Sequence, residues 1–176
     1  YSEDSEKIEH NNDKAKEVLE NAGWVYKYGE WRKTENYRTR TIDLTIIVDS
    51  TNENRVKVAK LIEKQLESIG INVYVNDVTK SGYERRLKQK DYEIILTGVY
   101  NSYNPDLTYF YGEDNLANLN NEEIINLLNE IKNISDEELL KEKYKEIINI
   151  SKSEAAYIGL YRSKNTVISG QGLMGE

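Results

Sequence analysis

The sequence contains no cysteine and a single histidine. Without cysteine there is no disulfide bond, no thiol nucleophile and no thiolate metal site. The histidine, His10, lies in a polar N-terminal stretch, so the usual general base and the usual zinc ligand are both nearly missing. Catalysis would have to depend on carboxylates alone. We therefore expect no enzymatic activity, no cofactor and no bound metal.

Positive charge is scarce relative to negative charge, with 24 lysines and arginines against 31 aspartates and glutamates and a net charge of −7. Such a field repels phosphate backbones and anionic membrane surfaces, which argues against nucleic acid as a partner. The densest basic run, residues 83–88, is interrupted by Glu84 and is typical of a solvated helix face.

Long apolar runs are missing as well. No stretch of about 18 apolar residues occurs, and the first residues, Tyr1 to Asp4, lack the charged and apolar regions of a signal peptide. We expect no membrane span in this sequence. If the protein is secreted, its export signal has been removed or lies outside the sequence.

What is present is the composition of a soluble globular protein, with 38% hydrophobic and 31% charged residues. A length of 176 residues suits one domain, residues 1–176, whose core is large enough to fold without disulfides or metal.

Apolar periodicity predicts alternating strands and helices in the first part of the chain. A helix is expected at 13–21, ended by Gly23 in a left-handed conformation, and the aromatic, glycine-rich stretch 24–41 is expected to form a loop or loose hairpin. The elements that follow are a strand at 42–48, a helix at 52–68 introduced by a Ser50–Glu53 capping box, a strand at 71–75, a helix at 83–88 and a strand at 92–97.

The order βαβαβ predicts an α/β sheet with flanking helices. The third strand, 92–97, is expected in its centre because the middle of that strand is continuously apolar. A long functional loop, 100–121, should follow it. The last expected elements are a helix at 122–132 capped by Asn120 or Asn121, a helix at 136–151 capped by Ser135 with Glu138, and closing strands at 155–161 and 166–169.

The candidate site is the segment that begins at Gly98, because ligands of open α/β sheets bind beyond the carboxyl ends of the strands. Tyrosine rings and asparagine amides suit contact with varied organic ligands, although such rings also commonly fill gaps under a loop. The candidate ligand-binding residues are Gly98, Val99, Tyr100, Asn101, Tyr103, Asn104, Asp106, Tyr109 and Asn118.

Enzymatic alternatives find less support. A carboxylate pair for glycoside hydrolysis could come from four residues, but nothing in the sequence sets their separation. The turn 49–53 has no glycine to cradle a phosphate and lacks the calcium-loop pattern, so helix capping is its more ordinary role. A carboxylate-based hydrolase is the weakest hypothesis. The four carboxylates are Asp91, Glu93, Glu113 and Asp114.

Seven segments occur in a distinctive order and spacing: 13–24, ending in Ala-Gly-Trp; 55–71, a helix and the start of a strand; Lys-Asp-Tyr-Glu-Ile at 90–94; Gly-Val at 98–99; Asn-Pro-Asp at 104–106; 118–128; and Ala-Ala-Tyr-Ile-Gly-Leu-Tyr at 155–161. Together they resemble the extracellular peptide-binding proteins of bacterial ABC importers, in the oligopeptide- and dipeptide-binding family. Nearly the whole chain takes part in the match.

The resemblance implies a periplasmic-binding-protein-like lobe, the second (C-terminal) of two, with the first lobe absent from this sequence. The family clamps a peptide or related small solute between its lobes and delivers it to a membrane permease. The resemblance also implies that the protein is a monomer with an extracellular location, either as a cell-surface lipoprotein or as a periplasmic protein. Its signal and anchor would lie outside this sequence. A sensor or interaction lobe that has lost transport is the alternative on the same scaffold.

Several positions depart from the family pattern. Val99 replaces a tryptophan, Asn104 and Ile125 each replace an aspartate, and the prolines expected at Ala156 and Gly159 are missing. Where relatives hold a peptide amine with an aspartate, this chain offers neutral groups after Gly98. These complement an ammonium less well, which predicts a departure from ordinary peptide recognition.

Overall fold

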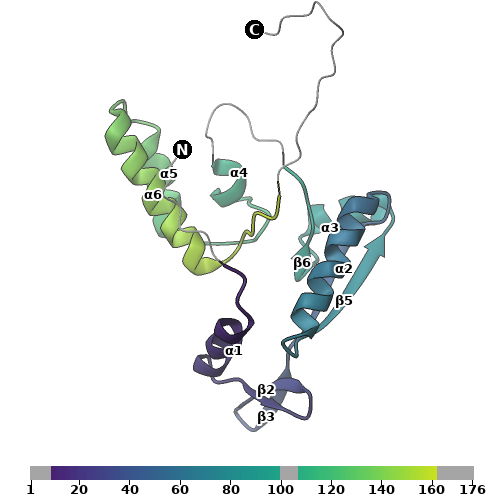
Figure 1. Cartoon of the computed structure of the whole chain (residues 1–176). Coiled ribbons are helices and arrows are strands. Elements are labelled where there is room, and N and C mark those ends of the chain that lie inside the picture. The colour runs from purple at the N-terminus through teal and green to yellow at the C-terminus, as the bar shows by residue number, and fades with distance from the viewer. Residues whose placement is uncertain (1–8, 100–106, 162–176) are drawn as a thin grey trace, which may run out of the picture.

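The computed structural model describes residues 9–99 and 107–161. Its centre is a parallel sheet of three strands, with order β5-β4-β6 (Figure 1). The strands are β4 (Asp43–Asp49), β5 (Asn72–Val78) and β6 (Ile94–Ile95), joined by α2 (Glu53–Glu67) and α3 (Lys80–Gln89). The predicted βαβαβ order is therefore confirmed.

The central strand is β4. It pairs with β5 along all seven of its residues but with β6 only through Ile46 and Ile47. The prediction that 92–97 forms the central strand is wrong, because β4 is central and β6 lies at the edge of the sheet that residues 9–99 and 107–161 form. The apolar run has another cause: Leu96 is buried in the core, and its carbonyl accepts a hydrogen bond from the Tyr83 hydroxyl at 3.1 Å.

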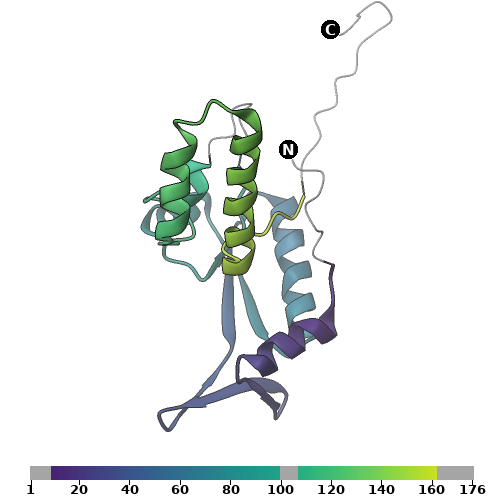
Figure 2. The same cartoon turned by 90° about the vertical axis from the view of Figure 1, so that its left-hand side faces the viewer.

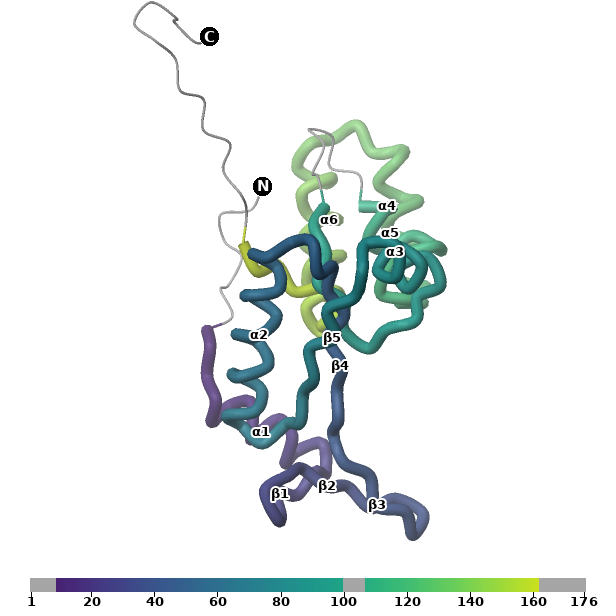
Figure 3. Tube along the Cα trace, turned by 90° about the vertical axis from the view of Figure 1, so that its right-hand side faces the viewer, coloured from purple at the N-terminus to yellow at the C-terminus, as the bar shows by residue number. Residues whose placement is uncertain are grey.

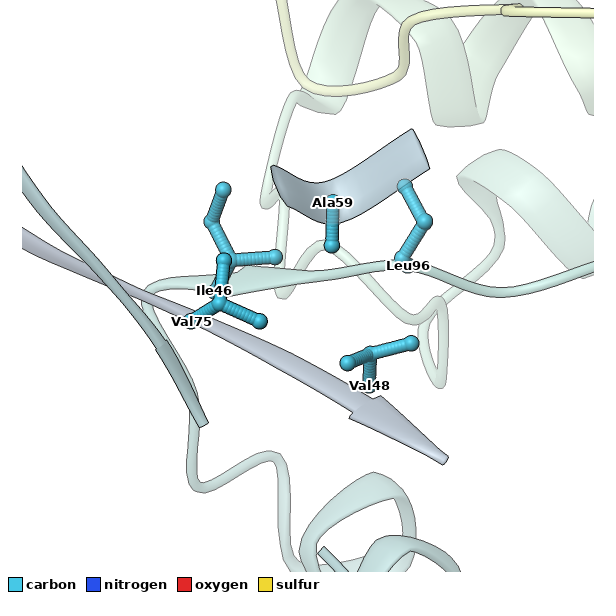
Figure 4. Packing of buried hydrophobic residues seen from close by; sticks show 5 residues of the cluster. All are labelled: Ile46, Val48, Ala59, Val75 and Leu96. Carbon is cyan, nitrogen blue, oxygen red and sulfur yellow. The ribbon is translucent and has the colours of Figure 1, made fainter. Parts of the chain in front are cut away.

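Helix α2 covers one face of the sheet. Ile46 and Val48 of β4 are fully buried there and pack with Ala59 of α2, whose small side chain lets the helix approach closely (Figure 4). Side chains alternate across a strand, so Ile47 faces the opposite side, and it is also buried. Each such β-branched side chain contributes about 1.5–3 kcal/mol by leaving water.

Two carboxylates bond to backbone amides that the sheet leaves unpaired. Glu63 of α2 accepts from the Val75 amide of β5 at 3.0 Å, and Glu93 accepts from the Thr45 amide of β4 at 2.7 Å. Unpaired strand edges invite association with other chains. These side chains therefore satisfy one amide on the side of β5 that faces away from β4, and one amide of β4 just before its pairing with β6 begins.

Residues 24–41 form a three-stranded antiparallel meander, which the predicted loop or loose hairpin describes only in part. Its strands are β1 (Val25–Lys27), β2 (Glu30–Glu35) and β3 (Arg38–Thr41). Both turns have consecutive positive φ angles, 59° and 86° at Tyr28 and Gly29, and 47° and 63° at Asn36 and Tyr37. Such angles are typical of tight hairpin turns that match the strand twist.

The meander is anchored by Trp31 of β2, which is 1% exposed and donates its indole N–H to the Ile69 carbonyl at 2.6 Å. Leu19 of helix α1 (Asn12–Asn21) and Leu44 of β4 pack against the same cluster. Figure 3 shows α1 and the meander together at one end of the sheet, where β4 and β5 begin. The amino end of the sheet is thus closed by a second hydrophobic core.

Helices α1 and α2 end in the same way. Beyond each helix a glycine takes a left-handed φ, 84° at Gly23, as predicted, and 86° at Gly70. After α1, the Gly23 and Trp24 amides bond back to the carbonyls of Glu20 and Leu19 at 2.9 and 3.0 Å. This Schellman arrangement satisfies carbonyls that the helix end leaves free.

The described part of the chain ends in a helical layer made of α4 (Thr108–Tyr111), α5 (Glu122–Ile131) and α6 (Glu137–Glu154). Figure 2 shows α5 and α6 packed side by side as a helical hairpin, with Ile124, Leu127, Leu128 and Ile147 buried between the helices of this layer. No helix in residues 9–99 or 107–161 is long and apolar enough to cross a membrane.

The caps of these helices refine the predictions. Asn121 caps α5 as expected, accepting from the Ile124 amide at 3.1 Å. Asp136, and not Ser135, caps α6 by accepting from the Leu139 amide at 2.9 Å, because the helix begins one residue later than a Ser135 cap requires.

Three further expectations change. The Ser50–Glu53 capping box is wrong, because Asn52 caps α2 through the Arg55 amide at 3.1 Å. The expected loop at 100–121 contains helix α4, and no strand forms at 155–161. The strand expected at 166–169 lies outside the described residues.

Helix α3 ends on Lys90, whose φ of 54° is left-handed, and the next amide, of Asp91, bonds back to Arg86 at 3.1 Å. A residue with a Cβ pays about 1 kcal/mol for this conformation. The Lys90–Asp114 ion pair, at 3.5 Å to an exposed carboxylate, offsets little of that cost.

We predict that Lys90→Gly raises the free energy of unfolding by about 1 kcal/mol in urea denaturation. Gln89→Gly is the matched control, because Gln89 is the last helical residue of α3 and glycine there should lower stability by about the same amount. A Lys90→Gly protein no more stable than the wild type would contradict the prediction.

Candidate functional site

The carboxyl edge of the parallel sheet contains a point where the chain reverses direction across the sheet. From β4 the chain passes through α2 to β5 on one side, and from β5 it passes through α3 to β6 on the other side of β4. The carboxyl ends of β4 and β6 therefore lie next to each other at this edge, and the chain leaves β4 toward β5, on the side away from β6. Ligands of open α/β sheets bind in the crevice at such a point, outside the carboxyl ends of the strands.

On the β4 side this edge of the sheet ends with Asp49, the last residue of the strand. One oxygen of its carboxylate accepts from both the amide and the hydroxyl of Thr51, at 2.9 and 2.8 Å. These hydrogen bonds, the backbone one first, lower the pKa of Asp49, with a smaller contribution from the nearby charges of Lys80 and Arg55. The carboxylate is therefore ionised at neutral pH and fixed in orientation.

On the β6 side Gly98 follows the strand by three residues. A Cβ built on Gly98 would lie 2.3 Å from Nη2 of Arg55, so the guanidinium occupies the space that any other residue's side chain would need. Gly98 was predicted as the first residue of the ligand-binding segment. The group found there is the Arg55 side chain, which the sequence reasoning did not single out.

The other predicted site residues are only partly described. Val99 follows Gly98 and is 39% exposed, Tyr109 lies on α4 and is 53% exposed, and Asn118 is exposed with a left-handed φ of 53°. No hydrogen bond or ring contact among the described residues joins Gly98 or Val99 to the other two. The remaining five, Tyr100, Asn101, Tyr103, Asn104 and Asp106, lie outside the described residues.

Aromatic rings gather where α4 meets the segment after α6. Tyr157 packs edge-to-face against Phe110 and Tyr111, with ring centroids 5.4 and 5.5 Å apart. Phe110 packs in the same way against Tyr109, with ring centroids 5.4 Å apart. Such pairs add about 0.5–1.5 kcal/mol beyond their buried area. Most of these rings therefore hold α4 in place, and Tyr109 is the one that remains largely exposed.

The loop from α4 to α5 is built around Asn115, which is 2% exposed. Its amide nitrogen donates to the carbonyls of Gly112 and Leu119 at 2.8 and 2.7 Å, and its oxygen accepts from the Leu119 amide at 2.9 Å. A buried amide whose hydrogen-bonding groups are satisfied specifies one loop conformation. Asn115 thereby fixes the loop that carries Asn118.

Two tyrosines attach the same loop to the rest of the protein. The Tyr92 hydroxyl donates to the Leu116 carbonyl at 2.6 Å, and the Tyr157 hydroxyl accepts from the Ala117 amide at 3.0 Å. Burial is the main cause that raises the pKa of both hydroxyls. Both therefore remain protonated at neutral pH.

A separate hollow of about 280 Å³ lies between α4 and α5. Thr108, Gly112, Leu128 and Lys132 are among its lining residues, and none of the predicted site residues belongs to that lining. Asp49 and Gly98, at the strand ends, are not among its lining residues either.

Three of the four carboxylates considered for hydrolysis, Asp91, Glu93 and Asp114, have structural contacts. Asp91 pairs with Arg86 at 2.9 Å, and Glu93 bonds to the β4 backbone as described above. Within the described ranges, no three histidine, aspartate or glutamate side chains gather into a cluster that could hold a metal ion.

Comparison with known families decides the classification. Residues 1–121 match the family model described as bacterial extracellular solute-binding proteins, family 5 Middle. The chain belongs to this family. It is also 26% identical, over 98% of its length, to the oligopeptide-binding protein AppA of Bacillus subtilis (strain 168), and it spans 33% of that relative.

Solved structures confirm the expected fold. The chain resembles B. subtilis AppA in complex with a nonapeptide, with 24% identity, coverage of 89% of this chain and 33% of AppA, and a TM-score of 0.78. It also resembles Campylobacter jejuni NikZ in complex with Ni(L-His), with 19% identity, coverage of 88% and 33%, and a TM-score of 0.75. This chain therefore has the α/β fold of solute-binding proteins, and it corresponds to about a third of their length.

We predict that Tyr157→Phe lowers the free energy of unfolding by about 1–2 kcal/mol, because it leaves the partly buried Ala117 amide without its acceptor. Urea denaturation measures the difference. Tyr161→Phe is the control, because Tyr161 is 62% exposed and its hydroxyl is accessible to water. Equal stability of the two variants would show that the loop does not depend on this bond.

Proposed function

We propose that this chain is one lobe of a two-lobed solute-binding protein that captures peptides or related small solutes for an ABC importer. The observation that carries the proposal is the reversal point at the carboxyl edge of the sheet, with Asp49 on one side and Gly98 on the other, in a chain of the solute-binding family.

The share of its relatives' length that the chain covers supports a lobe rather than a whole binding protein. It spans about a third of the relatives that it matches, including one whose name is oligopeptide-binding protein. A binding site of this kind buries most of its ligand. The crevice of this chain supplies one wall, and the opposite wall would come from the first lobe of the same protein, which closes over the ligand by a hinge.

The same assignment proposes the partners and the location. The loaded protein would dock, as a monomer, on the permease of an ABC importer. It would work outside the cytoplasmic membrane, in the periplasm or anchored to the cell surface as a lipoprotein. Its role would be capture and not catalysis.

We predict that the full-length protein binds peptides from a mixed nonapeptide library with submicromolar affinity, whereas residues 1–176 alone bind at least about a hundredfold more weakly. A single lobe provides only one wall, so the peptide is no longer enclosed and the site is no longer preorganised. The hydrogen bonds to the peptide then compete with water. Titration calorimetry measures both affinities.

Circular dichroism of the isolated chain is the necessary control, because weak binding is informative only if the chain is folded. Submicromolar binding by the isolated chain, roughly beyond −8 kcal/mol, would contradict the two-lobed clamp. Absence of peptide binding by the full-length protein would contradict peptide capture itself.

A further inference from the structure

We propose that Arg55 is the residue of this lobe that binds a carboxylate of the ligand, in the crevice between the carboxyl ends of β4 and β6. The inference rests on the proposed function and adds the chemical class of the ligand: solutes, peptides foremost, that carry a free carboxylate.

The first argument is the position of the guanidinium. Arg55 lies in the first turn of α2, directly after the connection that leaves β4. Its Nη2 lies 2.3 Å from where a Cβ on Gly98 would be, so the side chain reaches from the helix that follows β4 to the residues that follow β6. Glycine at position 98 is what makes room for it.

The second argument is the missing partner. The described residues include three half-buried arginines, Arg32, Arg55 and Arg86. Arg32 pairs with Glu30, and Arg86 pairs with Asp91 at 2.9 Å. Arg55 has no side-chain hydrogen bond and no ion pair within residues 9–99 and 107–161. A charge that is partly removed from water and unpaired favours an anion that can complete its hydrogen bonds.

The third argument concerns the carboxylate nearby. Asp49 is close enough for Arg55 to contribute to its lowered pKa, yet no contact within 4.0 Å pairs the two charges. One Asp49 oxygen is already held by Thr51. The N–H donors of the planar guanidinium are therefore available to another carboxylate. The guanidinium can bind such a group with two parallel hydrogen bonds.

The test uses the full-length protein and two probes: a nonapeptide pool that lacks aspartate and glutamate, supplied as free acids and as C-terminal amides. In the acid pool the C-terminal carboxylate is the only one. We expect the wild type to prefer the acids by about tenfold or more, because hydrogen bonds between charged groups are the strong ones. Arg55→Gln should remove this preference, and Arg55→Lys should keep part of it.

Two further variants separate the effect of charge from the effect of the position of Arg55. Lys57→Gln removes an exposed positive charge from another face of the same helix and should retain the full acid preference. Gly98→Ala keeps Arg55 but displaces its guanidinium, so it should reduce the preference without any change of charge. Thermal unfolding of each variant should resemble that of the wild type, because the Arg55 side chain has no bond to lose among the described residues.

The outcomes separate the two proposals. Binding of both pools with equal affinity by the wild type, or an acid preference that survives Arg55→Gln, would overturn the role of Arg55 and leave peptide capture standing. Failure of the wild type to bind either pool would overturn peptide capture, and the assignment of Arg55 with it.

Discussion

The parallel pairing of β4 with β5 is the constraint on which the rest of the structure depends. Seven residue pairs set the register, and a slip of one residue would turn Ile46 and Val48 away from α2. Because the two strands are parallel, the chain must cross back over the sheet, and α2 is that crossing. Its first turn must therefore begin at the carboxyl edge. The same pairing that builds the core thus brings Arg55 to that edge, next to Gly98.

The parts of the fold that the sequence predicts well are those with many periodic apolar residues. The strand at 42–48 and the helix at 52–68 each place several apolar side chains in one core, and their bounds agree with β4 and α2 within one residue. The meander was missed because one buried side chain, Trp31, anchors it and its strands are otherwise largely exposed. The central strand was predicted wrongly because the uninterrupted apolar run at 94–96 indicates only that both faces of the strand are covered. A strand at the edge of a sheet can also be covered on both faces.

The site divides in the same way. Gly98 and Val99 were predicted from the rule that ligands bind beyond strand ends, which needs only the order of the elements, and their role in binding stays a prediction. Arg55 was not among the predicted residues, because a charged residue in the first turn of a helix is ordinary in sequence. Its distinction is the approach to Gly98, across 43 positions of the chain, which is a tertiary fact. Asn115 was missed for a similar reason: in an asparagine-rich loop, sequence does not tell the buried amide from the exposed ones.

The two ends of the sheet have different physical tasks. The amino end is closed by the Trp31 cluster, so its side chains contribute to stability. At the carboxyl end the backbone satisfies itself: the Ser50 amide bonds to the Val78 carbonyl at 2.9 Å and the Asn52 amide to Asp49 at 3.1 Å. The β4 and β5 part of this edge therefore makes these backbone hydrogen bonds without a ligand. A preformed wall adds no ordering cost to binding, so affinity in such a protein depends on what the opposite wall encloses.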